Sequence, residues 1–191
     1  MEKWSNQCKK TWRLGFRFPR QNLSGLSAPK AYLNKIKLCG ADLSNSNLQD
    51  ANLWKAKLQN ANLWRANLQD ANVREAKLQN ANLFKANLQD TNLLVADLQN
   101  ADVWEANLQD ANLQNADLQN ADLSGANLQD GDLREAKLSG AIYTDSESKF
   151  IWCSNNDCST IVPDDFDPKQ AGRILIRTQE DYDKWKKYRQ K

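Results

Sequence analysis

Apolar residues recur along most of this chain at a period of five. Residues 31–145 divide into 23 units of five residues (115/5), and nearly every unit has Ala at its first position and Leu at its third. The other three positions carry mostly Asn, Asp, Gln, Lys or Arg. The departures are Val73, Val103 and Tyr143 at the third position, and Ile36, Ser46, Thr91 and Gly131 at the first.

This period excludes a helix for the repeats. A helix turns by about 100° per residue, so a five-residue period would scatter the Ala and Leu side chains around its whole circumference. In an extended chain, residues two apart point to the same side. We therefore predict that each unit is one short side of a coil, with Ala and Leu inside and a corner before the next unit.

The fifth position of the units indicates how many sides make one turn of the coil. In every second unit it alternates between two residue types, so that Asp returns every twenty residues at 50, 70, 90, 110 and 130 and Asn at 60, 80, 100 and 120. A twenty-residue repeat is four units, which predicts a four-sided coil. Successive coils would stack about 4.8 Å apart, the spacing of paired strands.

Runs such as ADLSNSNLQDANLWKAKLQNANL, at 41–63, resemble the A(D/N)LXX motif of the pentapeptide repeat family. The resemblance covers residues 31–145 and, more loosely, QNLSG at 21–25. It implies an all-β solenoid, a right-handed quadrilateral β-helix with the first and third residues of each unit facing inward. Because Leu is nearly alone at the third position, we expect a uniform tower of about six coils, roughly 29 Å tall.

The two ends of the chain differ from the repeats, and solenoids need caps where stacking stops. We predict an N-terminal capping segment at 1–20, the β-helix at 21–145, and a C-terminal loop and capping helix at 146–191. Trp4, Cys8 and Trp12 have helical spacing. The last segment, TQEDYDKWKKYRQK, offers Thr178 as a helix N-cap. The caps are therefore expected to be short helices or irregular segments.

Large aromatic residues occupy one corner of the predicted tower. Trp64, Phe84 and Trp104 fall at the fourth position of units one coil apart, which predicts an exposed strip with Arg65, Lys85 and Glu105 as its charged rim. Three interpretations remain open. The rings stabilise the stack, as cross-strand pairs do; they anchor a protein partner; or they stack on a carbohydrate or similar ligand.

A second apolar area is expected beside this strip. Trp54 is expected one side away, where it would widen the strip, and Leu94 and Val95 would add apolar surface on that second face.

Catalysis is not indicated by the composition. The 191-residue chain contains no histidine, which removes the commonest general base and most catalytic metal sites. No GxGxxG or Walker-type loop is present. We therefore predict a protein that is not an enzyme and needs no cofactor and no metal.

The charge of the tower argues against imitation of DNA, a mode of topoisomerase inhibition known in the family. Residues 31–145 hold 15 acidic and 10 basic residues, a net charge of −5 (10 − 15). Duplex DNA carries one charge per ~1.7 Å, or roughly 17 over a ~29 Å tower. The aspartates at the fifth position of every fourth unit suggest calcium, but asparagine takes the equivalent position on the opposite side. A role in the side-chain hydrogen bond of the corner turns explains both.

Four cysteines leave their redox state open. Cys153 and Cys158 are close enough in sequence for a loop disulfide, and Cys8 could reach Cys39 if the N-terminal segment folds back on the first coil. Free thiols are the alternative, and a zinc site without histidine is a weak one. A disulfide that responds to reductant would make the protein a redox-responsive regulator.

These patterns together predict a rigid, non-enzymatic module for protein–protein interaction, with an unidentified protein as its partner. The overall charge is close to neutral, at 26 basic and 24 acidic residues, and no nucleic-acid motif is present. No apolar run approaches the ~20 residues of a membrane span, and the first residues lack the apolar core of a signal peptide. We expect a soluble, cytoplasmic protein without membrane contact, as a monomer or an end-to-end dimer.

Overall fold

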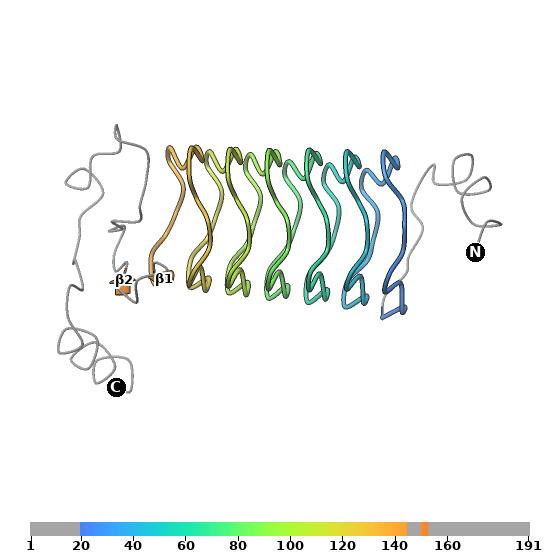
Figure 1. The fold of residues 1–191 in the computed structure, drawn as a ribbon, viewed down its shortest axis with the longest axis horizontal. Helices are drawn as coiled ribbons and strands as arrows, with labels where there is room; N and C mark the ends of the chain where they lie inside the picture. The colour runs from blue at the N-terminus through green and yellow to red at the C-terminus, as the bar shows by residue number, and fades with distance from the viewer. Residues whose placement is uncertain (1–19, 145–149, 153–191) are drawn as a thin grey trace.

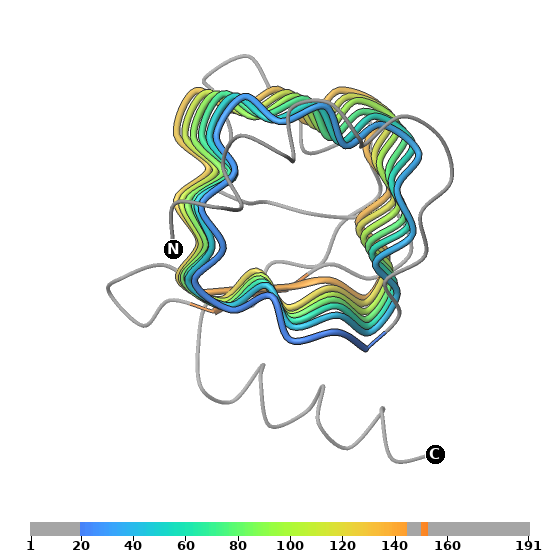
Figure 2. The same cartoon turned by 90° about the vertical axis from the view of Figure 1, so that its right-hand side faces the viewer.

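The computed structural model of the protein describes residues 20–144 and 150–152. These residues wind into a tower of stacked coils (Figure 1), and the view along the tower shows that the coils are four-sided (Figure 2). Isolated parallel β-bridges join the second residue of each unit to its equivalent 20 positions later, from Asn22↔Asp42 to Asp117↔Lys137. One coil therefore takes four units of five residues.

Hydrogen bonds between coils hold the tower together. In the unit 66–70, three of the five backbone N–H groups donate to carbonyl oxygens of adjacent coils. These bonds run from Asn67 to Ser46, from Leu68 to Asn87 and from Asp70 to Gln89, at 2.8, 2.8 and 3.0 Å. The chain turns after the third position, so only one residue per side lies within extended chain. This is why the tower is built from single bridges rather than from longer strands.

The fourth and fifth residues of each unit form a corner. At the corner of residues 69 and 70, the N–H of Ala71 donates to the carbonyl oxygen of Leu68 at 3.0 Å. The fifth residue has a positive φ, between 53° and 60° at every non-glycine fifth position from Arg20 to Glu135. A positive φ at the second corner residue alone, with this hydrogen bond, defines a type II turn.

The remaining backbone donor, at the fourth position, is bound by a side chain in the units whose second residue is Asn or Asp. The side-chain oxygen of Asn67 accepts from the N–H of Gln69 at 3.1 Å, and the same bond recurs at most units with Asn or Asp second. The sequence-based prediction that the fifth-position Asp and Asn side chains make this bond is wrong. Those residues instead tolerate the left-handed backbone that the corner requires.

One departure from the second-position pattern supports this explanation. Ser27 replaces Asn or Asp in the unit 26–30, and the fourth residue of that unit is Pro29, which has no N–H to satisfy. Proline also suits the first corner residue of a type II turn. An Asn or Asp at the second position thus satisfies this N–H, but the corner does not require it: the unit 56–60 has Lys57 second, and its corner still forms with the bond from Ala61 to Leu58 at 3.0 Å.

The core fills the inside of the tube. Third-position residues from Leu33 to Leu133 are at most 3% exposed, and most first-position alanines are equally buried. Thr91 is 0% exposed, and its hydroxyl donates to the carbonyl oxygen of Leu68 at 2.8 Å. The hydroxyl of Ser46, also at a first position, is buried without a hydrogen-bond partner.

After the last unit of the tower the chain changes to antiparallel pairing. Strand β1 (Ile142–Thr144) pairs with β2 (Phe150–Trp152), with Tyr143 opposite Ile151. This strand pair is not anticipated by the five-residue pattern, which places Tyr143 at the centre of a further unit. The predicted capping helices, Cys8, Cys153 and Cys158 lie outside the described residues.

Candidate protein-interaction surface

Trp64, Phe84 and Trp104, here called the aromatic column, lie at one corner of the tower in successive coils. Backbone bonds fix this stacking: the N–H of Arg65 donates to the carbonyl oxygen of Phe84 at 2.9 Å, and that of Lys85 to the carbonyl oxygen of Trp104 at 2.9 Å. First corner residues point away from the core because the positions on either side of the corner face inward. The backbone thus projects three rings from one edge of the molecule.

The rings contact one another and the adjacent charges. Phe84 and Trp104 are stacked, with ring centroids 4.9 Å apart and an interplanar angle of 27°. The Arg65 guanidinium lies 4.8 Å from the Trp64 ring centroid, and the Lys85 ammonium lies 5.0 Å from that of Phe84. Trp64 and Phe84 are half-buried, whereas Trp104 is 46% exposed. The column is therefore an accessible aromatic strip with cations over two of its rings.

The rim of the aromatic column is partly neutralised by an ion pair. Lys85 Nζ lies 3.0 Å from Glu105 Oε2 in the next coil, and both side chains are about two fifths exposed. Arg65, by contrast, is placed over the Trp64 ring and is exposed. The rim thus runs from a cation beside Trp64 to a carboxylate beside Trp104.

Trp54 does not widen the aromatic column. Positions 54 and 64 are ten residues apart, which is two sides of a four-sided coil, so the structure places Trp54 at the diagonally opposite corner. The expectation of a position one side away is wrong because it counts a single side for those ten residues. Leu94 and Val95 lie at this opposite corner two coils after Trp54, with Arg74 and Glu75 in the coil between, and Val95 is 48% exposed.

Trp54 is enclosed by charged side chains. The ammonium groups of Lys35 and Lys55 lie 5.1 and 4.6 Å from its ring centroid, and its Nε1–H donates to Glu75 at 3.4 Å. Lys55 and Arg74 also bind the Glu75 carboxylate, at 3.1 and 3.2 Å. The hydrogen bond from Lys55 is the main reason that the pKa of Glu75 lies below its usual value. The Trp54 ring is therefore already in contact with charged side chains of its own chain.

An asparagine ladder follows the side of the tower after the aromatic column. Side-chain amides donate to the side-chain oxygens one coil earlier at 3.1 to 3.4 Å, along the series Asn47, Asn67, Asn87, Asn107 and Asn127. The recurring NLQD of the sequence marks these positions, but its repetition alone does not reveal the bonds between the side chains. This side of the tower is uncharged at its centre.

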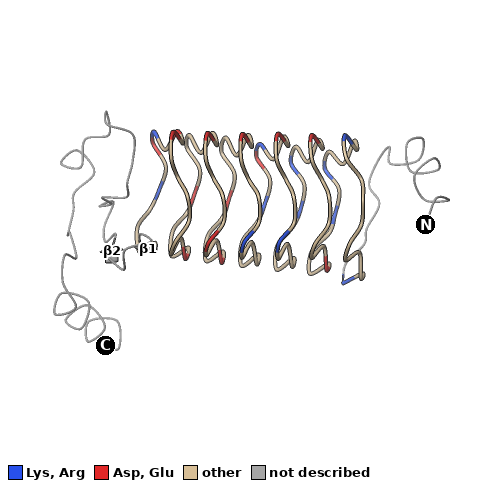
Figure 3. Ribbon diagram, in the orientation of Figure 1, with Lys and Arg blue, Asp and Glu red and all other residues tan. Residues whose placement is uncertain are grey.

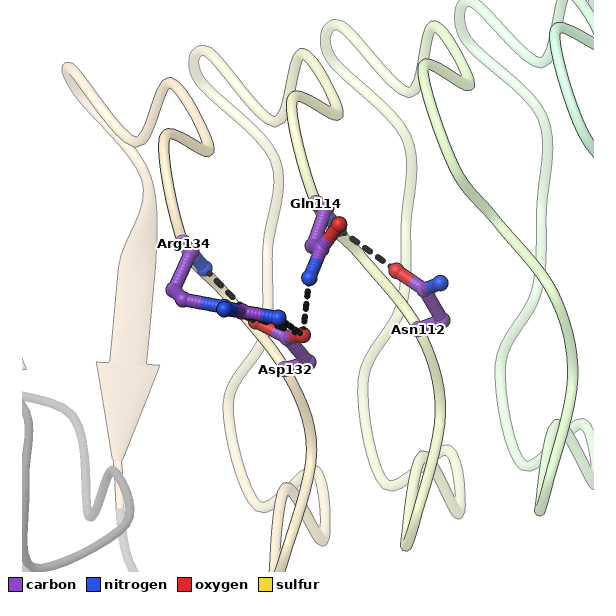
Figure 4. A network of polar contacts seen from close by, with 4 residues as sticks. All are labelled: Asn112, Gln114, Asp132 and Arg134. Carbon is purple, nitrogen blue, oxygen red and sulfur yellow. Dashed lines mark hydrogen bonds and ion pairs between the residues drawn. The ribbon is translucent and has the colours of Figure 1, made fainter.

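A cluster of charged and polar side chains lies at the Trp54 corner near the end of the described tower (Figure 4). The Arg134 guanidinium binds Asp132 at 2.6 Å, the side chain of Gln114 also donates to that carboxylate, and the Gln114 N–H donates to Asn112 at 3.0 Å. The hydrogen bond from Arg134 is the largest cause of a pKa of about 2 for Asp132. Sequence reasoning missed this cluster because the choice among nearby partners depends on side-chain conformation.

Other chemistry is sparse in the part of the chain that the structure describes. Residues 20–144 and 150–152 contain no group of three potential metal ligands and no helix long and apolar enough to cross a membrane. Cys39 is a half-buried free thiol that lies 3.2 Å from the side-chain oxygen of Gln59. Basic and acidic segments both recur along the tower (Figure 3).

Comparisons with known proteins agree with this architecture. A family model of pentapeptide repeats matches in 8 copies, at residues 22–54, 30–65, 46–83, 66–104, 76–115 and 106–142. Comparison with curated protein sequences gave no match.

Several solved structures are similar to the chain. HetL, a pentapeptide repeat protein involved in heterocyst differentiation regulation in the cyanobacterium Nostoc, is 33% identical over 67% of this chain and 65% of its own, with a TM-score of 0.39. A pentapeptide repeat protein of the Arabidopsis thaliana thylakoid lumen is 26% identical over 55% of this chain and 66% of its own, with a TM-score of 0.41. QnrB1, a plasmid-mediated fluoroquinolone resistance protein, is 18% identical over 65% of this chain and 68% of its own, with a TM-score of 0.43.

The chain spans just under two thirds of the length of HetL and of the Arabidopsis protein. The family matches extend from residue 22 to residue 142, which is more than half of the 191 residues. The chain therefore belongs to the pentapeptide repeat family, whose members form right-handed quadrilateral β-helices.

Proposed function

We propose that the protein is a non-enzymatic interaction module that binds another protein at the aromatic column. The observation that carries the proposal is the arrangement of Trp64, Phe84 and Trp104 at one corner of a rigid tower, with Trp104 46% exposed. Trp and Arg are enriched among the residues that dominate binding energy at protein interfaces. Aromatic side chains that are already held by backbone and stacking contacts also lose little conformational freedom on binding.

The same corner in other coils favours binding over a purely structural role for the rings. Ser44 and Ser124 take the position of the aromatic column in the coils before and after it. The backbone bonds of the corner continue through both serines, with the N–H of Glu105 donating to the carbonyl oxygen of Ser124 at 2.8 Å. The corner therefore forms without an aromatic ring.

Mixed charge on the tower favours a protein partner over imitation of DNA. Residues 31–145 carry 10 basic residues among 15 acidic ones, and two of the basic residues, Arg65 and Lys85, flank the aromatic column. A surface that imitates DNA needs a dense array of negative charges without such interruptions.

The proposal is tested by changing Trp64, Phe84 and Trp104 together to Ser, the residue that the same corner carries in adjacent coils. The matched control changes Gln69, Gln89 and Gln109, the first residues of the next corner in the same three coils, to Ser. Affinity capture from the source cells with quantitative mass spectrometry, together with thermal melting, gives the two readouts. We expect the aromatic variant alone to lose its captured proteins, with a melting temperature close to that of the control.

Two results would count against the proposal. Unchanged capture by the aromatic variant shows that binding lies elsewhere. A large loss of thermal stability in the aromatic variant, with capture retained, assigns the rings a structural role.

A further inference from the structure

We propose that the aromatic column binds a second copy of this chain, with the two towers side by side and antiparallel and the two Phe84 residues on the two-fold axis. The inference rests on the proposed function, because it names the partner at the same surface. It differs from the sequence-based expectation of a monomer or an end-to-end dimer, since in such a dimer the ends of the towers would meet.

The order of residues along the corner is the first observation. From one coil to the next the first corner position reads Ser44, Trp64, Phe84, Trp104 and Ser124, the same in both directions. Antiparallel pairing about Phe84 brings Trp64 opposite the partner's Trp104 and serine opposite serine. A two-fold axis requires a surface that is complementary to itself, and this order of side chains satisfies that condition.

The charges beside the rings select the antiparallel arrangement. Arg65 and Glu105 lie one coil before and one coil after Lys85 in the stacked second corner positions. Antiparallel pairing places Arg65 opposite the partner's Glu105, and the two-fold axis produces this pair twice. Parallel pairing would bring each charge level with the same charge of the partner, so that no opposite charges of the rim would be matched. Like charges across an interface are strongly unfavourable, so the rim distinguishes the two arrangements.

Lys85 lies on the proposed axis, where it would face its own counterpart. Its ammonium group is 3.0 Å from Glu105 Oε2 of the same chain and 5.0 Å from the Phe84 ring centroid. The ion pair within each copy offsets the charge of Lys85. The asparagine ladder next to the column adds no charge that would oppose either arrangement.

The size of the surface predicts a weak dimer. Stable dimers bury ~800 Å² per partner, and three partly buried rings with their rim supply less. We therefore expect a dissociation constant on the order of 100 µM, an affinity suited to reversible association.

Sedimentation equilibrium of the full chain, over concentrations from below to well above this value, tests the inference with three charge variants. Arg65→Glu places a carboxylate opposite the partner's Glu105, and Glu105→Arg places two arginines together. Each single variant should weaken association by about tenfold. The double variant Arg65→Glu/Glu105→Arg restores opposite charges across the axis and should associate like the wild type.

The double variant also provides an internal control. In it, the new carboxylate at position 65 replaces that of Glu105 as the partner of Lys85 one coil away, so a charge partner within the chain is kept. It lacks the Arg65 cation over the Trp64 ring, as the single variant does, so recovery cannot come from that contact. Thermal melting of all variants checks that each is folded.

The outcomes separate this inference from the proposed function. A wild-type chain that stays monomeric, or a double variant as weak as Arg65→Glu, overturns the second copy as partner; column-dependent capture of other proteins would then leave the proposed function standing. Dimerisation that survives the triple serine variant overturns the inference, because the copies then meet elsewhere. Loss of both dimerisation and capture in the triple serine variant supports this inference and the proposed function. Unaffected capture of other proteins by that variant contradicts the proposed function for those proteins.

Discussion

The side-chain amide of Asn107 donates to the side-chain oxygen of Asn87 in the preceding coil at 3.3 Å. The same oxygen of Asn87 accepts from the N–H of Gln89 at 3.3 Å, and the amide of Asn87 donates to Asn67 at 3.2 Å. One asparagine thus stabilises its own corner and joins three coils.

Replacing a member of the asparagine ladder should cost more than replacing an asparagine that serves only its corner. Asn82 is the control, since it binds the N–H of Phe84 at 2.9 Å and is not part of the ladder. We expect Asn82→Ala to lower the free energy of unfolding by ~1 kcal/mol, and Asn87→Ala by a further ~0.5–1.5 kcal/mol. Urea denaturation measures both, and equal losses would show that the ladder contributes nothing.

Truncation of a core leucine should destabilise the tower strongly. Leu88 is 1% exposed in the middle of the described coils, so Leu88→Ala removes buried methyl groups and leaves a cavity. We expect a loss of ~2–5 kcal/mol in the free energy of unfolding. Gln89→Ala, at the adjacent outward position, should change it by less than ~0.5 kcal/mol. Similar losses for the two variants would contradict the inward direction of the third position.

Val95 is expected to be a source of instability. It has a φ of 58°, a left-handed conformation that is costly for a β-branched residue, and its side chain is 48% exposed. Val95→Asn should raise the free energy of unfolding by ~1 kcal/mol, because asparagine tolerates this backbone. The reverse change at the equivalent position of the next coil, Asn115→Val, should lower it by a similar amount. Chemical denaturation of both variants would refute the explanation if their shifts had the same sign.

The Asp132 carboxylate should contribute stability that depends on pH. Its pKa in the folded protein is about 2, below the value of 3.8 for the unperturbed group. The contribution is therefore complete above pH 4 and is lost as the pH falls from about 4 through about 2. Asp132→Asn keeps a side-chain oxygen for the N–H of Arg134 but removes the charge.

The stability difference between wild type and Asp132→Asn gives the measurement. We expect it to be below ~1 kcal/mol at pH 7, because the paired Arg134 side chain is 74% exposed, and to approach zero near pH 2. Urea denaturation from pH 7 to pH 2 would exclude this role if the difference were constant over that range.

Most of the architecture of the tower can be predicted from the five-residue period of the sequence. Ala and Leu positions are decided by which side chains can be buried, and burial of Leu88 and its equivalents follows from the period alone. The alignment of Trp64 and Phe84 at one corner depends only on the twenty-residue coil. These features are predictable because each repeats the same local geometry.

The remaining features depend on information that the period does not contain. The contacts of Trp54 with Lys35 and Glu75 arise from side-chain conformations among several charged neighbours within reach. Assigning the corner bond to its acceptor side chain requires the backbone dihedrals, because Asn occurs at both the second and the fifth positions. Strand β1 pairs antiparallel where the repeat ends, so the period has no bearing on its register.

The bridge from Asn47 to Asn67 implies strict rules for changes in chain length. Inserting one twenty-residue coil after residue 70 would lengthen the molecule by about 4.8 Å and leave every downstream side chain facing its original direction. Inserting only five residues there would rotate everything downstream by a quarter turn. Trp64 and Trp104 would then occupy different corners, although the core would still be filled. Length variation in multiples of twenty thus preserves the corner that each side chain occupies, and other multiples of five preserve folding alone.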